Sequence, residues 1–265
     1  MATPYFAVLG PVEVTRAGRP IPLPGVRTRS LLAALLISAN QAVPVDDLIE
    51  AVWDRGSPTH PRSALQNAVF RLRGALGDAL TLESAGAGYR LWVDDDQLDL
   101  LQMERALQIA RGESAMWELE KIVRLWRGTP LSNVDSKVLR RDMVPRLTDR
   151  YLTAVERWAE LCLQHGRHEA VAENLPTLMT VNSYREKLIG YLMVAYFQDG
   201  RSADALLLYE RTRRSINENL GIDPSTSLQQ LHIRILRRDE EPTLNFPLPT
   251  LGQNLQAHSN SIPSA

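Results

Sequence analysis

Apolar residues recur at helical spacing in three segments near the start of the chain. The stretch from Arg27 to Ala39 is apolar at this spacing along most of its length, and Val45 to Trp53 forms a short amphipathic segment. In the third segment, residues 59–77, the apolar positions make one stripe: Leu65, Val69, Leu72 and Leu76. Three helices are therefore predicted, each with a face to bury.

The third segment has suitable residues at both of its ends. Thr59 or His60 can cap its start, and Pro61 suits the first helical turn. Gly77 can end it. The face opposite the apolar stripe bears no acid and carries side chains that bind phosphates or reach base edges: Arg62, Ser63, Gln66, Asn67, Phe70, Arg71 and Arg73.

Alternating patterns before and after the helices predict strands. Residues 80–84 and 89–93 alternate around a turn with glycines at 86 and 88, which indicates a β-hairpin. Three short strand candidates precede the helices: Phe6–Leu9, Val12–Thr15 and Pro20–Leu23. Three helices followed by a hairpin form a winged helix-turn-helix with the third helix in the recognition position, and a small preceding sheet is typical of its OmpR-type variant. We expect residues 1–95 to fold as a closed core of this kind.

Beyond the hairpin the pattern is helical almost throughout. The acidic run at residues 94–96 marks a boundary, and Asp99 can cap a new helix with Gln102 completing a capping box. An all-α domain is predicted over residues 96–241, which makes the whole chain α+β. Its expected helices are Leu100–Arg111, Met116–Trp126, Val144–His165, Arg167–Thr180, Tyr184–Gln198, Ala203–Leu220 and Ser225–Arg237.

A repeat is visible within these helices. Gly166-Arg167 and Gly200-Arg201 lie 34 residues apart, and each pair opens a helix with Ala170 or Ala205 soon after. This spacing is the period of tetratricopeptide repeats, whose stacked helix pairs form a concave surface for docking proteins. We favour a short tetratricopeptide-like array, and the alternative is an unspecialised helical bundle.

Composition limits the class of protein. The 265 residues are enough for two domains, and 44% hydrophobic with 23% charged residues is typical of a globular protein. Residues 242–265, rich in Pro, Asn, Gln and Ser, predict a disordered tail. No apolar run approaches ~18 residues and no signal peptide opens the sequence, so we expect a cytoplasmic protein without membrane contact. The single cysteine, Cys162, lies in an apolar helix and is expected to be buried.

Charge distribution is more informative than net charge, which is −1. The second helix and its end carry the acids Asp46, Asp47, Glu50 and Asp54, whereas the charges of the third helix are all arginines. A near-neutral chain with a local positive stripe is suited to DNA at a defined docking face, without a large nonspecific background.

Several short motifs in register resemble one family. They are Phe6-x-Val8-Leu9-Gly10-Pro11-x-Glu13-Val14, Arg29-x-Leu31-Leu32-Ala33-x-Leu35-Leu36, Leu48-Ile49-x-x-Val52-Trp53, Leu65-Gln66-x-x-Val69-x-Arg71-Leu72-Arg73 and Gly88-Tyr89-Arg90-Leu91. The second half continues with Leu125-Trp126-Arg127-Gly128, Gly200-Arg201-x-x-x-Ala205-Leu206 and Leu220-Gly221-Ile222-Asp223-Pro224. Together they resemble the Streptomyces antibiotic regulatory protein (SARP) family, with the later motifs similar to its bacterial transcriptional activation domain. The resemblance covers residues 5–238.

This resemblance implies a transcriptional activator of a secondary-metabolite (antibiotic) gene cluster. It implies two protomers side by side on tandem direct repeats of double-stranded promoter DNA, near the −35 element. The helical half would contact RNA polymerase holoenzyme through its sigma factor and the carboxy-terminal domain of its alpha subunit. Such a protein is cytoplasmic and associated with the nucleoid.

Each part of the predicted winged helix has an expected role on DNA. The base-edge group on the third helix is Arg62, Ser63, Gln66, Asn67 and Phe70, and the phosphate group is Arg71, Arg73, Thr28 and Arg29. Phe70 either meets a thymine methyl or packs against the wing or the first sheet. Tyr89 and Arg90 would approach the minor groove, although the tip of the wing has no basic residue.

Residues for other chemistry are sparse. No catalytic constellation is visible, so we predict neither an enzyme nor a bound cofactor. His165 and His168 have a spacing that could suit a metal, but Gly166 interrupts the helix between them, and no metal site is predicted. The five tryptophans are expected to pack in cores: Trp53, Trp92, Trp117, Trp126 and Trp158. The alternative function is a protein-interaction scaffold that does not bind DNA.

Overall fold

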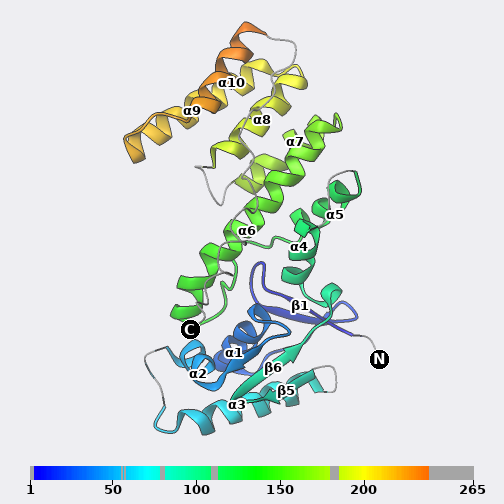
Figure 1. The fold of residues 1–265 in the computed structure, drawn as a ribbon, viewed down its shortest axis with the longest axis vertical. Helices are drawn as coiled ribbons and strands as arrows, with labels where there is room; N and C mark the ends of the chain where they lie inside the picture. The colour runs from blue at the N-terminus through cyan, green and yellow to red at the C-terminus, as the bar shows by residue number, and fades with distance from the viewer. Residues whose placement is uncertain are drawn as a thin grey trace, which may run out of the picture. The chain divides into compact units, whose positions relative to one another are not determined.

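The computed structural model describes residues 3–54, 56, 58–77, 81–108, 113–179 and 185–238. It separates into two compact units, Met1–Asn182 and Ser183–Ala265. Within the first unit, two small sheets and three helices are followed by further helices, and the second unit is helical in its described part (Figure 1). The expected α+β order, a winged helix followed by an all-α half, is confirmed.

The first sheet is antiparallel, with strands β1 (Pro4–Ala7), β2 (Glu13–Arg16) and β3 (Arg19–Pro20) in that order. Phe6 pairs with Val14 across β1 and β2, and both side chains are buried. The predicted strands differ from these by one to three residues at their ends. The first strand ends before Val8 because the backbone amides of Val8 and Leu9 donate to a side chain from the second half instead of to a strand.

Three helices form the centre of the winged helix: α1 (Gly25–Ile37), α2 (Val45–Trp53) and α3 (Pro61–Leu76). Residues 31–36 of α1 are all buried, so this helix forms the middle of the core. The predicted stripe of α3 is confirmed, since each of its four members is at most 2% exposed: Leu65, Val69, Leu72 and Leu76. His60 precedes α3 as its N-cap without a side-chain hydrogen bond to the helix.

The wing has one strand more than expected. Strands β5 (Thr81–Ala85) and β6 (Gly88–Trp92) form the predicted hairpin, and β4 (Ala42–Pro44) adds to β6 in the order β4-β6-β5. At the β4–β6 contact, a Cβ on Gly88 would lie 2.0 Å from the carbonyl oxygen of Val43. Glycine at this position is therefore what lets the two strands approach each other.

In its described residues, the helical half of the first unit contains a short 3-10 helix, η2 (Asp95–Gln97), and the α-helices α4 (Asp99–Gln108), α5 (Glu113–Arg124), α6 (Lys137–Gln164) and α7 (His168–Leu178). Helix α6 starts seven residues before the predicted Val144, because the hydroxyl of Ser136 caps it by accepting from the amide of Leu139. Pro145 lies inside the helix.

The expectation that residues 1–95 form a closed core is wrong. The buried carboxylate of Asp99 accepts hydrogen bonds of 2.9 Å from the amides of Val8 and Leu9. Asn133 bonds both to the amide and to the carbonyl of Val12. Leu98, Leu131, Val134, Leu139 and Leu147 belong to the same hydrophobic core as the winged helix. Residues beyond 95 thus complete this core. The division into a DNA-binding part that ends at residue 95 and an activation part that follows it stays a prediction.

The predicted role of Asp99 as a helix cap is also wrong. The capping box is formed instead by Asp94 and Gln97 around η2, and the side chain of Gln102 donates to the carbonyl of Asp96. Asp99 points into the core, where burial raises the pKa of its carboxyl, while the amides of Leu9 and Val8 and the charge of Arg127 oppose that rise.

The two glycine–arginine pairs form the same local turn. Gly166 and Gly200 have φ of 71° and 75°, and the following amides donate to the carbonyl five residues back. This is the Schellman arrangement at a helix end. Gly166 ends α6 before α7 in the first unit. Gly200 separates α8 (Glu186–Gln198) from α9 (Ser202–Leu220) in the second unit, where α10 (Thr226–Arg237) also packs on α8 and α9.

Buried and exposed side chains test the remaining expectations. Cys162 is fully buried, and burial raises the pKa of its thiol to about 12. Trp158 is buried and Trp126 stacks on Tyr151, but Trp92 and Trp117 are 45% and 47% exposed, so the prediction of core packing is wrong for these two. Among the described residues, no helix is long and apolar enough to span a membrane. The predicted tail, residues 242–265, lies outside the described residues.

Candidate nucleic-acid interface

Helix α3 presents an exposed polar face away from the core. Because successive residues are rotated by roughly 100°, Ser63, Asn67 and Phe70 point almost opposite to the buried stripe. All three are exposed, and Phe70 is 76% exposed. The alternative in which Phe70 packs against the wing or the first sheet is therefore wrong, and its ring is available to a ligand.

The arginines lie on the two flanks of this face. Arg71 is exposed on one flank. On the other, Arg73 donates a hydrogen bond of 2.7 Å to the carbonyl of Leu82 in β5, which ties α3 to the wing. Arg62 forms an ion pair of 3.7 Å with Asp46 of α2, and because both side chains are about four-fifths exposed, this pair is weak. Gln66 is exposed on the same flank as Arg62 and Arg73.

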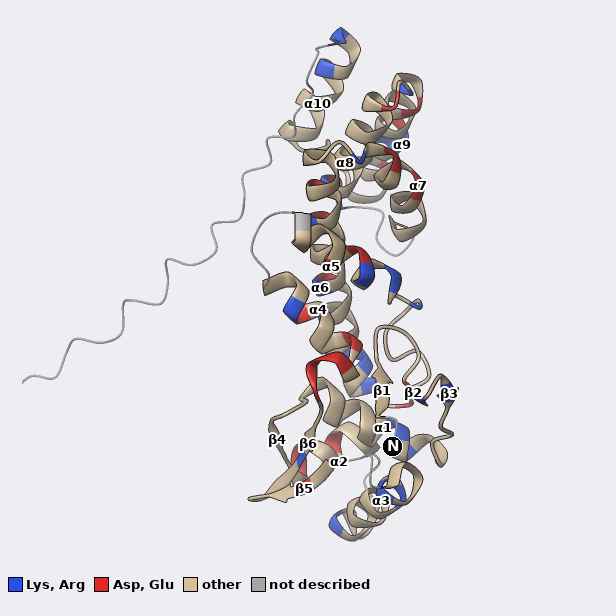
Figure 2. Ribbon diagram, turned by 90° about the vertical axis from the view of Figure 1, so that its right-hand side faces the viewer, with Lys and Arg blue, Asp and Glu red and all other residues tan. Residues whose placement is uncertain are grey.

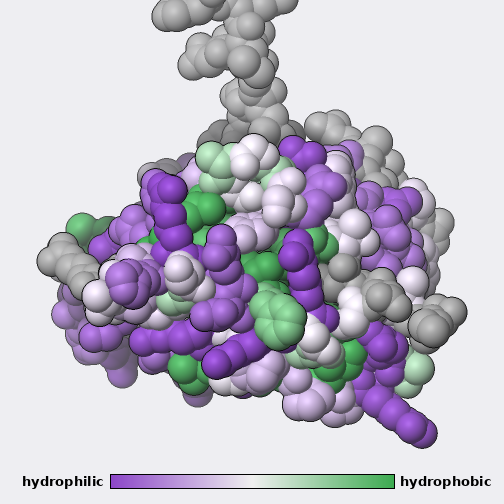
Figure 3. Space-filling model, turned by 90° about the horizontal axis from the view of Figure 1, so that it is seen from below, coloured by the Kyte–Doolittle hydropathy of each residue, from purple (hydrophilic) through white to green (hydrophobic). Residues whose placement is uncertain are grey.

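The charge pattern of the winged helix is uneven. In Figure 2 the ribbon of α3 carries basic residues and no acidic ones, and the acids of this part of the chain lie mainly on α2, on β5 and in the segment before α4. Figure 3 views the molecule from the α3 side of Figure 1, and its surface there is mainly hydrophilic with apolar patches between the polar side chains. The exposed Phe70 fits such a mixed surface.

The two wing residues are largely engaged within the wing. Tyr89 is half-buried and packs against the core. The guanidinium of Arg90 lies 5.0 Å from the ring centre of Trp92 and 3.5 Å from the carboxylate of Glu83. The two-residue tip, Gly86 and Ala87, brings no charge. On the wing, therefore, Arg90 is a cation that Glu83 partly neutralises, and the tip beyond it is uncharged.

The residues expected to hold phosphate at the start of α1 behave differently from each other. Thr28 is only 2% exposed, so its predicted contact with DNA through the side chain is wrong. Arg29 is half-buried and donates a hydrogen bond of 3.2 Å to the carbonyl of Asn133. Both residues serve the packing of α1 in this structure.

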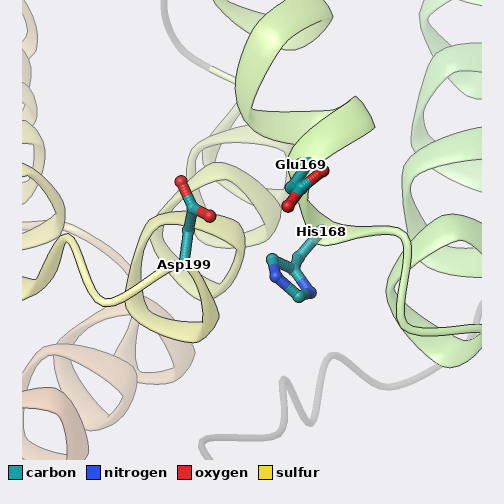
Figure 4. A group of neighbouring side chains, drawn as sticks. All are labelled: His168, Glu169 and Asp199. Carbon is teal, nitrogen blue, oxygen red and sulfur yellow. The ribbon is translucent and has the colours of Figure 1, made fainter.

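We assign no metal site to the histidines and acids that lie outside the exposed face of α3. The ring nitrogen Nδ1 of His165 lies 2.8 Å from the carbonyl of Leu161 in the same helix. His168 and Glu169 lie in the first turn of α7, and Asp199 follows α8 (Figure 4). Because the first two belong to one compact unit and Asp199 to the other, we assign no ligand set to them.

A group of residues that join the two halves of the first unit was not foreseen from the sequence. Asp54 at the end of α2 bonds to the first residues of α6. Arg127 pairs with Glu13 at 2.7 Å and lies 3.6 Å from Asp99. Asn133 holds Val12. Their spacing in the sequence gives no signal, because Lys137, Glu13 and Val12 lie more than 80 residues away from Asp54, Arg127 and Asn133, their respective hydrogen-bond partners.

A winged helix with an acid-free, exposed third helix, joined to an all-α half, defines a transcription regulator of the winged-helix class. Two family models of transcriptional regulator domains match the chain, in agreement with this class. Residues 18–91 match the model of the transcriptional regulatory protein C-terminal domain, and residues 93–236 match the bacterial transcriptional activator domain. The chain belongs to the bacterial transcriptional activator domain family and is a regulator of the SARP type with an OmpR-like DNA-binding domain.

Individual relatives support this assignment. Transcriptional regulatory protein EmbR of Mycobacterium tuberculosis is 34% identical over 245 residues, which cover 88% of this chain and 63% of EmbR. Transcriptional regulator RedD of Streptomyces coelicolor is 31% identical, with 91% of this chain and 72% of RedD covered. A solved structure of EmbR in complex with a low-affinity phosphopeptide has a TM-score of 0.77 at 32% identity, over 90% of this chain and 66% of that one. The chain thus spans about two thirds or less of the length of EmbR.

Proposed function

We propose that this protein is a sequence-specific DNA-binding activator of transcription. The observation that carries the proposal is the outer face of α3, where exposed Ser63, Asn67 and Phe70 stand on an acid-free helix in the recognition position of a winged helix. The chain also matches two family models of transcriptional regulators and is similar to EmbR and RedD, which are named as transcriptional regulators, and these matches support the same role.

In this proposal α3 lies in the major groove. Asn67, at the centre of the exposed face, can bond an adenine edge through two atoms, and Ser63 and Gln66 can read neighbouring bases. Phe70 meets a thymine methyl, because it offers an apolar ring among polar side chains. Arg62, released from its weak pair with Asp46, reaches base edges at the start of the helix.

Phosphate binding is assigned mainly to Arg71 on the free flank of α3. Arg73 holds the wing through Leu82 and can reach a phosphate with its remaining donors. Arg29 can bind phosphate only with the N–H groups that do not bond to Asn133. Thr28 is not part of the proposed interface, because its side chain is buried. Arg90 approaches the minor groove with Tyr89 beside it, from behind a tip that bears no cation.

The helical half is proposed to recruit RNA polymerase holoenzyme through its sigma factor and the carboxy-terminal domain of its alpha subunit. Two protomers bind side by side on direct repeats in the promoter, and the genes controlled form a secondary-metabolite cluster. The family to which the chain belongs supports these partners, and RedD and AfsR of Streptomyces coelicolor are regulatory relatives. The protein acts in the cytoplasm, at the nucleoid.

The test combines a gel shift on promoter fragments of neighbouring genes with run-off transcription by purified polymerase. We expect retardation of fragments with direct repeats, footprints at those repeats, and transcription that rises with the protein. A chain that retards no fragment in a sequence-dependent way would contradict the proposal and favour the protein-interaction scaffold. Sequence-specific binding without activation would limit the function to occupying the promoter.

A further inference from the structure

One side chain joins the helix-turn-helix directly to the long helix of the activator half. Asp54 directly follows α2, in the turn that leads to α3. Its Oδ2 accepts a hydrogen bond of 3.1 Å from the amide of Lys137, and its Oδ1 accepts one of 3.1 Å from the amide of Val138. These are the first two residues of α6, whose amides have no partner within the helix.

The same carboxylate also meets the cap of α6. The hydroxyl of Ser136, which is fully buried, lies 3.2 Å from Oδ1 of Asp54 and accepts from the amide of Leu139. Asp54 and Ser136 together satisfy three successive amides at the positive end of the α6 dipole. Burial by itself would raise the pKa of Asp54, but the bonds from Val138, Lys137 and Ser136 hold it below its ordinary value.

The backbone of Asp54 is in a conformation that favours glycine. Its φ is 53° and its ψ −133°, and a non-glycine residue in such a region is strained. An aspartate at this position is thus opposed by its own backbone, and the bonds of its carboxylate to α6 are what offset that strain.

A second contact supports the same junction. Arg27 of α1 donates a hydrogen bond of 2.7 Å to the carbonyl of Val52 in α2 and lies 3.9 Å from the carboxylate of Asp135, just before α6. This ion pair is partly exposed and adds little by itself. Asp54 is therefore the stronger of the two contacts between the end of α2 and the start of α6.

We infer that Asp54 is a positioning residue that fixes the direction of α6 relative to the recognition helix α3. Docking of α3 on DNA then also orients α6, together with the helices α5 and α7 that pack on it in the same unit. The functional consequence rests on the proposed activator role: without the carboxylate, the chain would still bind its operator but would present α5, α6 and α7 over a wider range of directions relative to α3.

The orientation is measured first, independently of transcription. Spin labels are placed on the full chain at Ala42→Cys in the wing and Gln164→Cys at the end of α6, both exposed, while the native Cys162 is buried. We expect one narrow distance distribution for the parent and a broader or shifted one for Asp54→Asn and Asp54→Gly. Asp47→Asn, an equal charge change at an exposed position at the start of α2, should keep the parent distribution. An unchanged distribution in both Asp54 variants would overturn the inference.

The glycine variant separates the carboxylate from the backbone. Glycine accepts φ of 53° without strain, so if only the backbone conformation mattered, Asp54→Gly would behave like the parent. We expect instead that both variants exchange the amides of Lys137 and Val138 at least about tenfold faster than the parent. Parent-like exchange in Asp54→Gly would assign Asp54 a backbone role only.

Activity is then compared at DNA-saturating concentration. We expect Asp54→Asn to bind operator DNA within about twofold of the parent and to activate run-off transcription about fivefold less. Equal losses in binding and activation would show a general loss of folding and overturn the positioning role. If the parent itself fails to activate, the proposed function fails, whereas the label distances still decide whether Asp54 orients α6.

Discussion

The carboxylate of Asp99 accepts hydrogen bonds from the backbone amide of Val8, 91 residues earlier, with both of its oxygens at 2.9 Å. The amide of Leu9 shares one of these oxygens. The amides of Val8 and Leu9, which follow β1, thus donate to the carboxylate of Asp99 instead of to a neighbouring strand. This contact makes the winged helix depend on a residue of the helical half.

Asp99→Ala should destabilise the first unit by about 3 kcal/mol, because it leaves two buried amides without a partner. Thermal or urea unfolding of the full chain measures this loss. Asp95→Ala, at an exposed site in η2, should change stability by less than about 0.5 kcal/mol. Equal stability of the two variants would mean that Asp99 does not hold the first sheet.

Truncation tests the same dependence on a larger scale. A fragment that ends at residue 96 lacks Asp99, Leu131 and Asn133, so we expect it to lose cooperative unfolding. A fragment of residues 1–182, which keeps the first compact unit, should unfold cooperatively and still bind operator DNA. Circular dichroism with heating compares the two fragments. If the shorter fragment unfolded cooperatively at a temperature near that of the longer one, residues 1–96 would form a closed core by themselves.

The local structure could be predicted well from the sequence, whereas the contacts between elements that lie far apart in the sequence could not. The stripe of Leu65, Val69 and Leu72 identifies the buried side of α3, because helical periodicity depends on neighbours within one turn or two. The amide of Lys137, which Asp54 accepts, and the amide of Val8, which Asp99 accepts, lie more than 80 residues away from these aspartates, and a lone aspartate looks the same in sequence whether it is solvated or buried. Thr28 was misplaced for a related reason: the side of α1 that faces solvent is decided by tertiary packing.

Gly88→Ala should disrupt the wing. The added Cβ would lie 2.0 Å from the carbonyl oxygen of Val43, and that atom belongs to backbone that cannot move without separating β4 from β6. We expect a loss of about 2 kcal/mol or more and weaker DNA binding. Gly74→Ala is the matched control, since its Cβ meets nothing within 4 Å and alanine should stabilise the helix by about 0.5–1 kcal/mol. Equal effects would show that β4 does not pack on the wing.

Acid should release α6 from Asp54. Because the pKa of Asp54 is lowered below its ordinary value of 3.8, its contribution to stability is complete above that value and is lost as the pH falls through the lowered pKa. The amide resonance of Val138 should therefore titrate with a midpoint below 3.8 in the parent. It should not titrate in this way in Asp54→Asn. A midpoint at or above the ordinary value would mean that the carboxylate does not accept the amide.

Two substitutions on α3 should separate base reading from phosphate binding. Asn67 stands at the centre of the exposed face, so Asn67→Ala should relax specificity at one operator position by about 1–3 kcal/mol and leave the salt dependence unchanged. Arg71 lies on the flank, so Arg71→Ala should weaken binding to every sequence similarly and reduce the slope of log K against log salt by about one unit. Titrations of operator and scrambled DNA at several salt concentrations measure both effects.

Arg213→Ala provides the control for these two variants. Arg213 lies on α9 in the second unit and pairs locally with Glu210, so removing its charge should leave both the specificity and the salt slope of operator binding as they are in the parent. If Arg71→Ala changed base preference while the slope stayed at the parent value, the roles of Arg71 and Asn67 would be exchanged. The docking of α3 would then be rotated about its axis, with the flank of Arg71 turned toward the base edges.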